Sequence, residues 1–156
     1  IMVSHLNKKN NPIMVDVGKK DSTQRIAEAE GNVVFDKKTF RKIESLKSKK
    51  GSIKNIAIIA GIMGAKETSR LIPLCHNIPI DSVNIEISKN NEKNLMKVKA
   101  TVKTYSKTGV EMEALTAVTI SCLTIYDMCK YLNKSIKIHN VKLILKKGGK
   151  SGYFKN

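Results

Sequence analysis

The chain has 156 residues, and its 29 Lys and Arg against 13 Asp and Glu give a formal net charge of +16. This length and a hydrophobic fraction of 41% fit one globular domain with a buried core. The sequence has no run of about 18 apolar residues, so we expect no membrane span. Three cysteines, an odd number without CxxC spacing, argue against a disulfide framework and against structural zinc and suit a reducing compartment.

The excess of positive charge indicates an anionic partner: nucleic acid, a membrane surface or a phosphorylated small molecule. Base readout leans on arginine and single-strand binding on aromatic stacking. The chain has only three arginines, and its aromatic fraction is 4%. A nucleic-acid-binding module is a competing interpretation, which the charge favours and the few arginines and aromatics oppose. A lysine-rich surface without a specific partner is another.

The first half of the chain predicts an arm, a strand and two helices. Residues 1–24 are polar and without periodicity, so we expect a flexible arm. The stretch QRIAEAEGNVVFD that follows predicts a strand or a hairpin. Asp36 is the expected cap of a helix that continues to about residue 48. Ser52 is the expected cap of a second helix, which Pro73 must end near residue 72.

The second half predicts a hairpin, a long helix and a last strand. Residues 82–88 and 95–105 alternate and flank a polar turn. Residues 111–132 carry one continuous apolar stripe at helical spacing. A strand near 136–146 precedes a basic Gly-rich tail, 147–156, which we expect to be mobile. We predict a two-layer α+β fold with helices on one face of a mainly antiparallel sheet, and a single catalytic domain over residues 25–146.

The long helix carries two acidic candidates. Asp127 lies opposite the apolar stripe, and Lys130 is its neighbour on that face. Glu113 lies fourteen residues before Asp127, which is about 21 Å along a straight helix. If both are catalytic, either the chain turns back or the site lies between subunits of a symmetric oligomer. An ordinary solvated Asp–Lys pair is the competing interpretation.

Glu111 and Glu113 project alike only from an extended chain, so the pattern suits a strand end or turn just before the helix. Such a carboxylate pair can divide into acid and base when the two environments separate the pKa values. A helix N-terminus that favours negative charge is the alternative.

The segment LIPLCHNIPI places Cys75 beside His76 between two prolines. Adjacent residues of an extended chain point to opposite faces, so a nucleophile–base pair is not expected. A hydrogen-bonded structural histidine and a substrate-binding histidine remain as alternatives. The tail motif KKGGKSG lacks phosphate-loop spacing. Its lysines could still close over a polyphosphate.

Four segments carry a close resemblance to a known family: MVDVGKK, AGIMGAKETSRLIPLCHNIPI, KTGVEMEALTAVTISCLTIYDMCK and KKGGKSG. In order and spacing they resemble the cyclic pyranopterin monophosphate synthase family of molybdenum cofactor biosynthesis. The likeness spans about residues 14 to 152, and Asn77 departs from it because the family usually has proline there. It implies a ferredoxin-like subunit in a homohexamer, a trimer of dimers with active sites between subunits.

The resemblance also implies the reaction. The substrate is 3′,8-cyclo-7,8-dihydroguanosine triphosphate, and the products are cyclic pyranopterin monophosphate and pyrophosphate. The enzyme is then a lyase of the phosphorus–oxygen type that needs no redox cofactor. Whether magnesium assists the reaction is left open, and no metal site is predicted. The expected partner is the small-molecule substrate, and neither a membrane nor nucleic acid is expected. We expect a cytoplasmic enzyme, with an organellar form as the alternative.

The resemblance further implies roles for individual residues. The catalytic candidates are Asp127, Lys130, Lys50 and Lys146. The substrate-binding candidates that match family positions are Leu74, Cys75, His76, Glu111, Met112 and Glu113. We add Lys66 and Lys150 as our own hypothesis, from their positive charge. We expect Asp127 to act in proton transfer, with Lys130 or Lys50 as the acid. We expect Lys146, Lys150 and Lys66 to neutralise phosphate. Cys75 is expected to contribute packing or its backbone.

Overall fold

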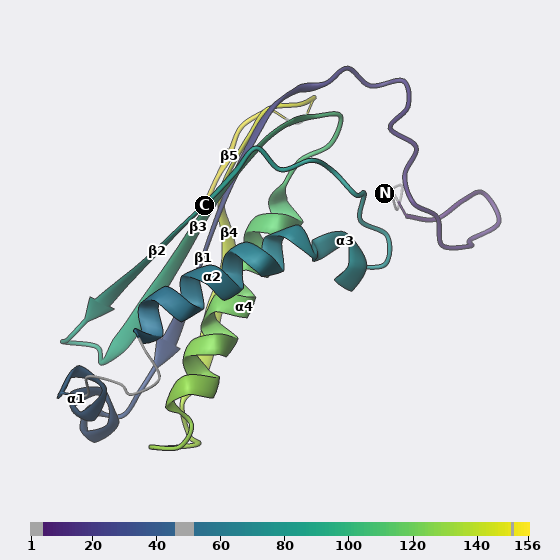
Figure 1. Ribbon diagram of the computed structural model, residues 1–156. Helices are drawn as coiled ribbons and strands as arrows, with labels where there is room; N and C mark the ends of the chain where they lie inside the picture. The colour runs from purple at the N-terminus through teal and green to yellow at the C-terminus, as the bar shows by residue number, and fades with distance from the viewer. Residues whose placement is uncertain (1–4, 46–51, 151) are drawn as a thin grey trace.

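The computed structural model describes residues 5–45, 52–150 and 152–156. Its elements in chain order are β1 (Thr23–Val34), α1 (Lys37–Ser45), α2 (Ile53–Lys66), α3 (Thr68–Leu71), β2 (Ser82–Asn90), β3 (Leu95–Ser106), α4 (Glu111–Cys129), β4 (Lys137–Lys147) and β5 (Phe154–Lys155). Within these residues the strands form one antiparallel sheet in the order β2-β3-β1-β4-β5. Helices α2 and α4 lie across one face (Figure 1). This is the ferredoxin-like two-layer sandwich, and the predicted fold class is confirmed.

The central strand β1 alternates between a core face and an open face. Ala27, Ala29, Gly31 and Val33 are buried, while the residues that alternate with them, at 28, 30 and 32, are half-buried. Small residues on this face let α4 approach closely. A Cβ on Gly31 would lie 2.8 Å from Val118 Cγ1 on that helix. The period of two in the sequence therefore marks one continuous strand, and the hairpin alternative is wrong.

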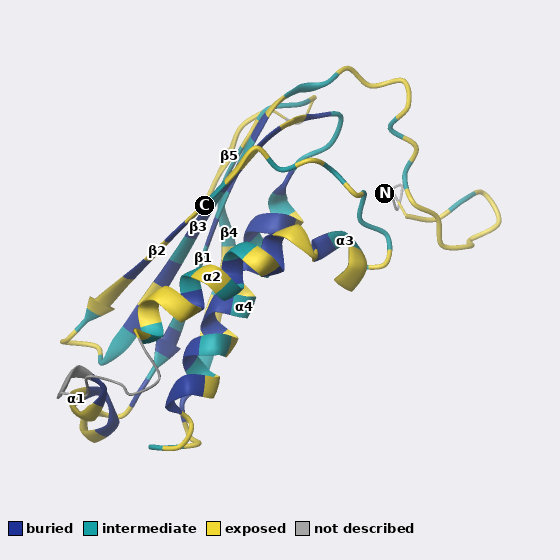
Figure 2. Ribbon diagram, viewed as in Figure 1, coloured by how far each residue is buried: buried dark blue, intermediate teal, exposed yellow. Residues whose placement is uncertain are grey.

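Helix α4 is the core helix of the domain. Its buried residues recur along one stripe that faces the sheet and α2, as the dark ribbon in Figure 2 shows. Against α2, the Ser121 hydroxyl donates to the Ala57 carbonyl at 2.9 Å. By length and mean hydropathy, 19 residues and 1.2, α4 also meets the criteria for a membrane span. Half of that stretch is buried inside the domain, which is the pattern of a core helix.

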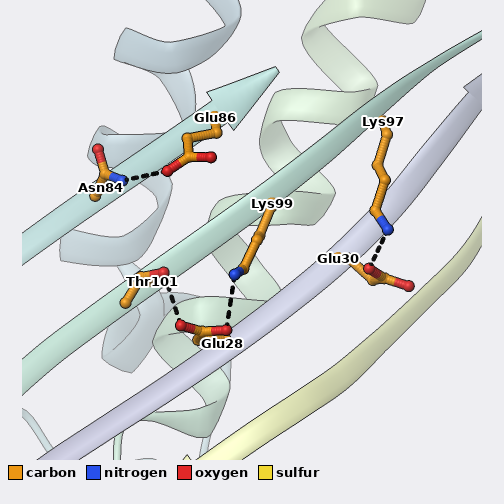
Figure 3. Close-up of polar contacts among 7 residues, drawn as sticks. All are labelled: Glu28, Glu30, Asn84, Glu86, Lys97, Lys99 and Thr101. Carbon is orange, nitrogen blue, oxygen red and sulfur yellow. Dashed lines mark hydrogen bonds and ion pairs between the residues drawn. The ribbon is translucent and has the colours of Figure 1, made fainter. Parts of the chain in front are cut away.

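The open face of the sheet is polar and paired across strands (Figure 3). Lys97 lies 2.6 Å from Glu30, and Lys99 lies 2.9 Å from Glu28. Both pairs join β3 to β1 in the register that also aligns the buried residues of the two strands. Partly exposed pairs of this kind contribute about 0.2–1 kcal/mol each, so they support the register more than the stability.

One predicted helix differs from the observed elements. The single helix expected to residue 72 is divided into α2 and α3 at Glu67. There the buried Thr68 hydroxyl donates to the Ala65 carbonyl at 2.9 Å, and such back-bonding competes with a regular helix. In the tail, which was expected to be mobile, Phe154 and Lys155 pair with β4. The end of the helix after Asp36 falls partly outside the described residues.

Candidate active site

Two adjoining cavities lie where α4 begins. We call the larger one, of about 700 Å³, the basic cavity, and the smaller one, of about 420 Å³, the histidine cavity. They share Lys20, Thr108, Gly109 and Glu111. Each cavity also has a wall from the segment before β1, which arches over this end of the molecule (Figure 1).

The basic cavity is dominated by positive charge. Its basic side chains are Lys19, Lys20, Arg25, Lys107, Lys146 and Lys150, and its acidic ones are Asp21 and Glu111. Lys146 Nζ, from β4, lies 2.6 Å from Glu111 Oε1, and about a quarter of each side chain is exposed. A concave surface with an excess of cations concentrates anions, and phosphate groups are the ordinary ligands of such a site.

A turn of two glycines closes the basic cavity on the tail side. Gly148 and Gly149 have φ values of +96° and +78°, in the left-handed region that glycine adopts without strain. A Cβ on Gly149 would collide with the guanidinium of Arg25, which is itself only 8% exposed. The GG pair of KKGGK is therefore needed to bring Lys150 over the cavity.

Glu113 gives the histidine cavity an acid–base group. The side chain lies in the first turn of α4 and is 5% exposed. Burial raises its pKa from 4.5 to about 7, and the nearby charge of Glu111 adds to the rise. A carboxyl group with this pKa can both give and take a proton at neutral pH.

The Cys75–His76 segment forms the opposite wall of the histidine cavity. His76 Nε2 lies 2.7 Å from the Val15 carbonyl, and because a carbonyl oxygen only accepts, Nε2 carries the proton. The Thr104 hydroxyl on β3 holds the far end of this loop through the Pro79 carbonyl at 2.5 Å. Burial raises the pKa of Cys75, with Glu113 adding to the rise. Both effects oppose a thiolate nucleophile.

The structure corrects one local expectation. Glu111 and Glu113 lie in the helical first turn of α4 and not in an extended segment. They still reach one site because the cavity lies over the end of the helix, where Glu111, Met112 and Glu113 all line it. Gly109 makes this possible, since a Cβ there would collide with the Glu111 carboxylate. The helix N-terminus also favours negative charge, which was the alternative interpretation of this pair.

The predicted site residues divide into two groups. Those brought together at the two cavities are Leu74, Cys75, His76, Glu111, Met112, Glu113, Lys146 and Lys150. Asp127 and Lys130 form an ion pair of 2.6 Å at the opposite end of α4, with 66% and 53% of their side chains exposed. Lys66 is exposed at the end of α2 and lines neither cavity. Lys50 lies outside the described residues.

The surroundings of Lys130 differ from those expected of a catalytic acid. Its hydrogen bond to Asp127 raises the lysine pKa, whereas a lysine acid near neutral pH needs a lowered one. Within one chain, therefore, Asp127 and Lys130 stabilise each other's charges, and neither reaches the cavities.

Several residues of the site were not predicted. His5, Val15 and Val17 line the histidine cavity, and Arg25 and Lys107 line the basic cavity. The polar arm before β1 shows no periodicity, and its residues lie far in sequence from the loop and helix that they meet. Val15, Val17 and Lys107 do lie in two motifs that carry the family resemblance, MVDVGKK and KTGVEMEALTAVTISCLTIYDMCK, but no hydropathy pattern assigned them to a site.

Cavities of this size with convergent cations and a buried titratable carboxyl are typical of an enzyme that acts on a phosphorylated small molecule. The MoaC family model matches residues 14–149. Several curated relatives are named cyclic pyranopterin monophosphate synthase. The relative from Helicobacter pylori strain Shi470 is 51% identical, with 96% of this chain and 95% of the relative covered. The relative from Campylobacter lari strain RM2100 is 49% identical, with 97% of each covered. The relative from Thermoanaerobacter sp. strain X514 is 46% identical, with 97% of this chain and 96% of the relative covered. The chain belongs to the MoaC family.

Proposed function

We propose that this chain is a cyclic pyranopterin monophosphate synthase of molybdenum cofactor biosynthesis. It converts 3′,8-cyclo-7,8-dihydroguanosine triphosphate to cyclic pyranopterin monophosphate and pyrophosphate, as a lyase of the phosphorus–oxygen type. The names of relatives that are about half identical over nearly the whole chain support this activity. The observation that carries it is the pairing of a cationic cavity with an adjoining cavity that holds a near-neutral carboxyl group.

The two cavities suit the two parts of the proposed substrate. The triphosphate, and later the pyrophosphate that leaves, would lie in the basic cavity among Lys20, Lys146 and Lys150. Cations at that place stabilise the charge that develops on the leaving group. The purine-derived ring would lie in the histidine cavity beside His76 and Glu113. Glu113 can then carry protons between ring atoms, and the proposed reaction involves no redox cofactor.

A shared site between subunits completes this proposal. Asp127 and Lys130 match family active-site positions but lie at the far end of α4 from the cavities. A neighbouring copy of the chain would bring that end to the cavities. Helix α2 also leaves Ile59 and Met63 59% and 57% exposed, and an apolar outer helix face favours association. We propose a homohexamer, a trimer of dimers, in the cytoplasm.

The experiment is turnover of the cyclised GTP precursor, followed by pyrophosphate release. Wild type is expected to be active, with Glu113→Gln and Asp127→Asn each reduced by at least about 100-fold. Co-expression of the two variants in equal amounts should then restore about a quarter of wild-type activity, because one site in four would receive both intact residues. Asp127→Asn mixed with Lys130→Met is the matched control. It should restore nothing, because both residues come from the same half of the site.

Inactive but folded wild-type protein would refute the activity. Active wild type without recovery in the first mixture would refute only the shared site.

A further inference from the structure

The segment before β1 is built into the site. We call residues 5–20 the N-terminal strap. Its half-buried Val15 and Val17 face the histidine cavity, and Lys20 lines both cavities. Both cavities would lose a wall if the strap moved away.

Two side chains from elsewhere in the fold hold the strap. His76 Nε2 donates to the Val15 carbonyl at 2.7 Å, and Lys107 Nζ donates to the Gly18 carbonyl at 2.8 Å. Between these points Asp16 Oδ1 accepts from the Gly18 amide at 2.7 Å, which forms a tight local turn. Both donors bind backbone oxygens, so they fix the path of the strap and not the identity of its side chains.

Lys107 occupies a position that connects the strap to the start of α4. Its own carbonyl accepts from the buried Arg25 guanidinium at 3.2 Å, which ties its backbone to β1. Beside it, the Ser106 hydroxyl donates to the Thr108 carbonyl at 2.7 Å. The chain then enters α4 directly at Glu111. Lys107 therefore has a fixed backbone from which its ammonium reaches the strap.

We propose that Lys107 is a positioning residue that, together with His76, holds the N-terminal strap closed over the two cavities and so sets Lys20 against the bound phosphate groups. The catalytic part of this inference rests on the proposed function, whereas the closure of the strap does not. A lysine that only touched phosphate would leave the strap unchanged in the free enzyme. A lysine that holds the strap controls its opening whether or not a ligand is bound.

The first test is amide hydrogen exchange of the full-length, ligand-free protein, read by mass for peptides covering residues 13–20. Lys107→Met should speed exchange there by about tenfold, since one hydrogen bond of ordinary strength is lost. Lys107→Arg keeps a donor and should restore slow exchange. Lys103→Met is the matched control, because this exposed lysine of β3 lines neither cavity. Equal strap exchange in Lys107→Met and Lys103→Met would overturn the proposal.

The second test is steady-state kinetics with the cyclised GTP precursor. Lys107→Met should raise KM by about tenfold while kcat changes by less than about threefold, because the strap contributes to binding in ground and transition states alike. His76→Gln keeps a side-chain donor and should retain slow strap exchange, whereas His76→Ala should lose it. A fall in kcat at constant KM in Lys107→Met would assign that lysine to the chemical step and overturn a positioning role. Inactive wild type with the expected exchange results would refute the proposed function and leave the strap intact.

Discussion

Replacing Glu113 by glutamine should remove most of the loss in unfolding free energy that the wild type shows as the pH rises. Glu113 is 5% exposed, and burial raises its pKa from 4.5 to about 7. Between these pH values the folded state keeps a proton that the unfolded state has released. Stability therefore falls as the pH rises through this window, and the loss is complete above the folded pKa.

The size of the effect follows from the same shift. A rise from 4.5 to about 7 corresponds to about 3 kcal/mol of unfolding free energy, since one pKa unit equals about 1.4 kcal/mol. A glutamine has nearly the same shape and stays neutral at every pH. Relative to wild type, Glu113→Gln should thus gain up to about 3 kcal/mol between pH 4 and pH 8.

Urea unfolding of both proteins at pH 4, 6 and 8, at one fixed protein concentration, measures this difference. Glu86→Gln removes one negative charge from the exposed face of strand β2 and serves as the control. A constant difference between wild type and Glu113→Gln across the range, or a Glu113 carboxyl that titrates near 4.5 by carbon NMR, would refute the reasoning.

Three further changes test other parts of the structure. Gly61→Ala should destabilise the fold by about 1–3 kcal/mol in thermal or urea unfolding, because its Cβ would collide with Ser121 Oγ where α2 meets α4. Cys75→Ala should keep pyrophosphate release within about 100-fold of wild type, and a larger loss would assign the thiol to the chemistry. Asp36→Ala should lower the melting temperature clearly at pH 7 and much less at pH 2. Hydrogen bonds from Thr39 hold the pKa of Asp36 at about 2, below its ordinary 3.8, so its contribution is lost as the pH falls through that range. Equal destabilisation at both pH values would contradict this.

The elements of the fold could be predicted because their signals are local. The Ser52 hydroxyl accepts from the Asn55 amide at 3.3 Å, and Asp36 accepts from the Thr39 amide at 2.9 Å, so both predicted caps are confirmed. The alternation in β3 and the apolar stripe of α4 likewise record which side of each element is buried. The break at Glu67 was missed because it depends on a side-chain bond that competes with the helix.

The site was only partly predictable. Resemblance to a family singled out the loop around His76 and the first turn of α4, and the structure brings both to the histidine cavity. The near-neutral pKa of Glu113 could not be read from the sequence, because it results from burial under neighbours that are remote in the chain. Whether Asp127 joins the site is a question of assembly, since one chain holds it at the other end of α4.

By itself, the sequence determined the strands, the helices and the family, since periodicity, caps and ordered motifs depend on residues that are near one another in the chain. The motif MVDVGKK linked part of the N-terminal strap to the family, but the tertiary structure alone decided that the strap forms a wall of the site. The strap is held by His76, which is 61 residues from its partner Val15, and by Lys107, which is 89 residues from its partner Gly18. Hydrogen bonds over such separations exist only once the sheet and helices have brought the segments together, so no local pattern encodes them.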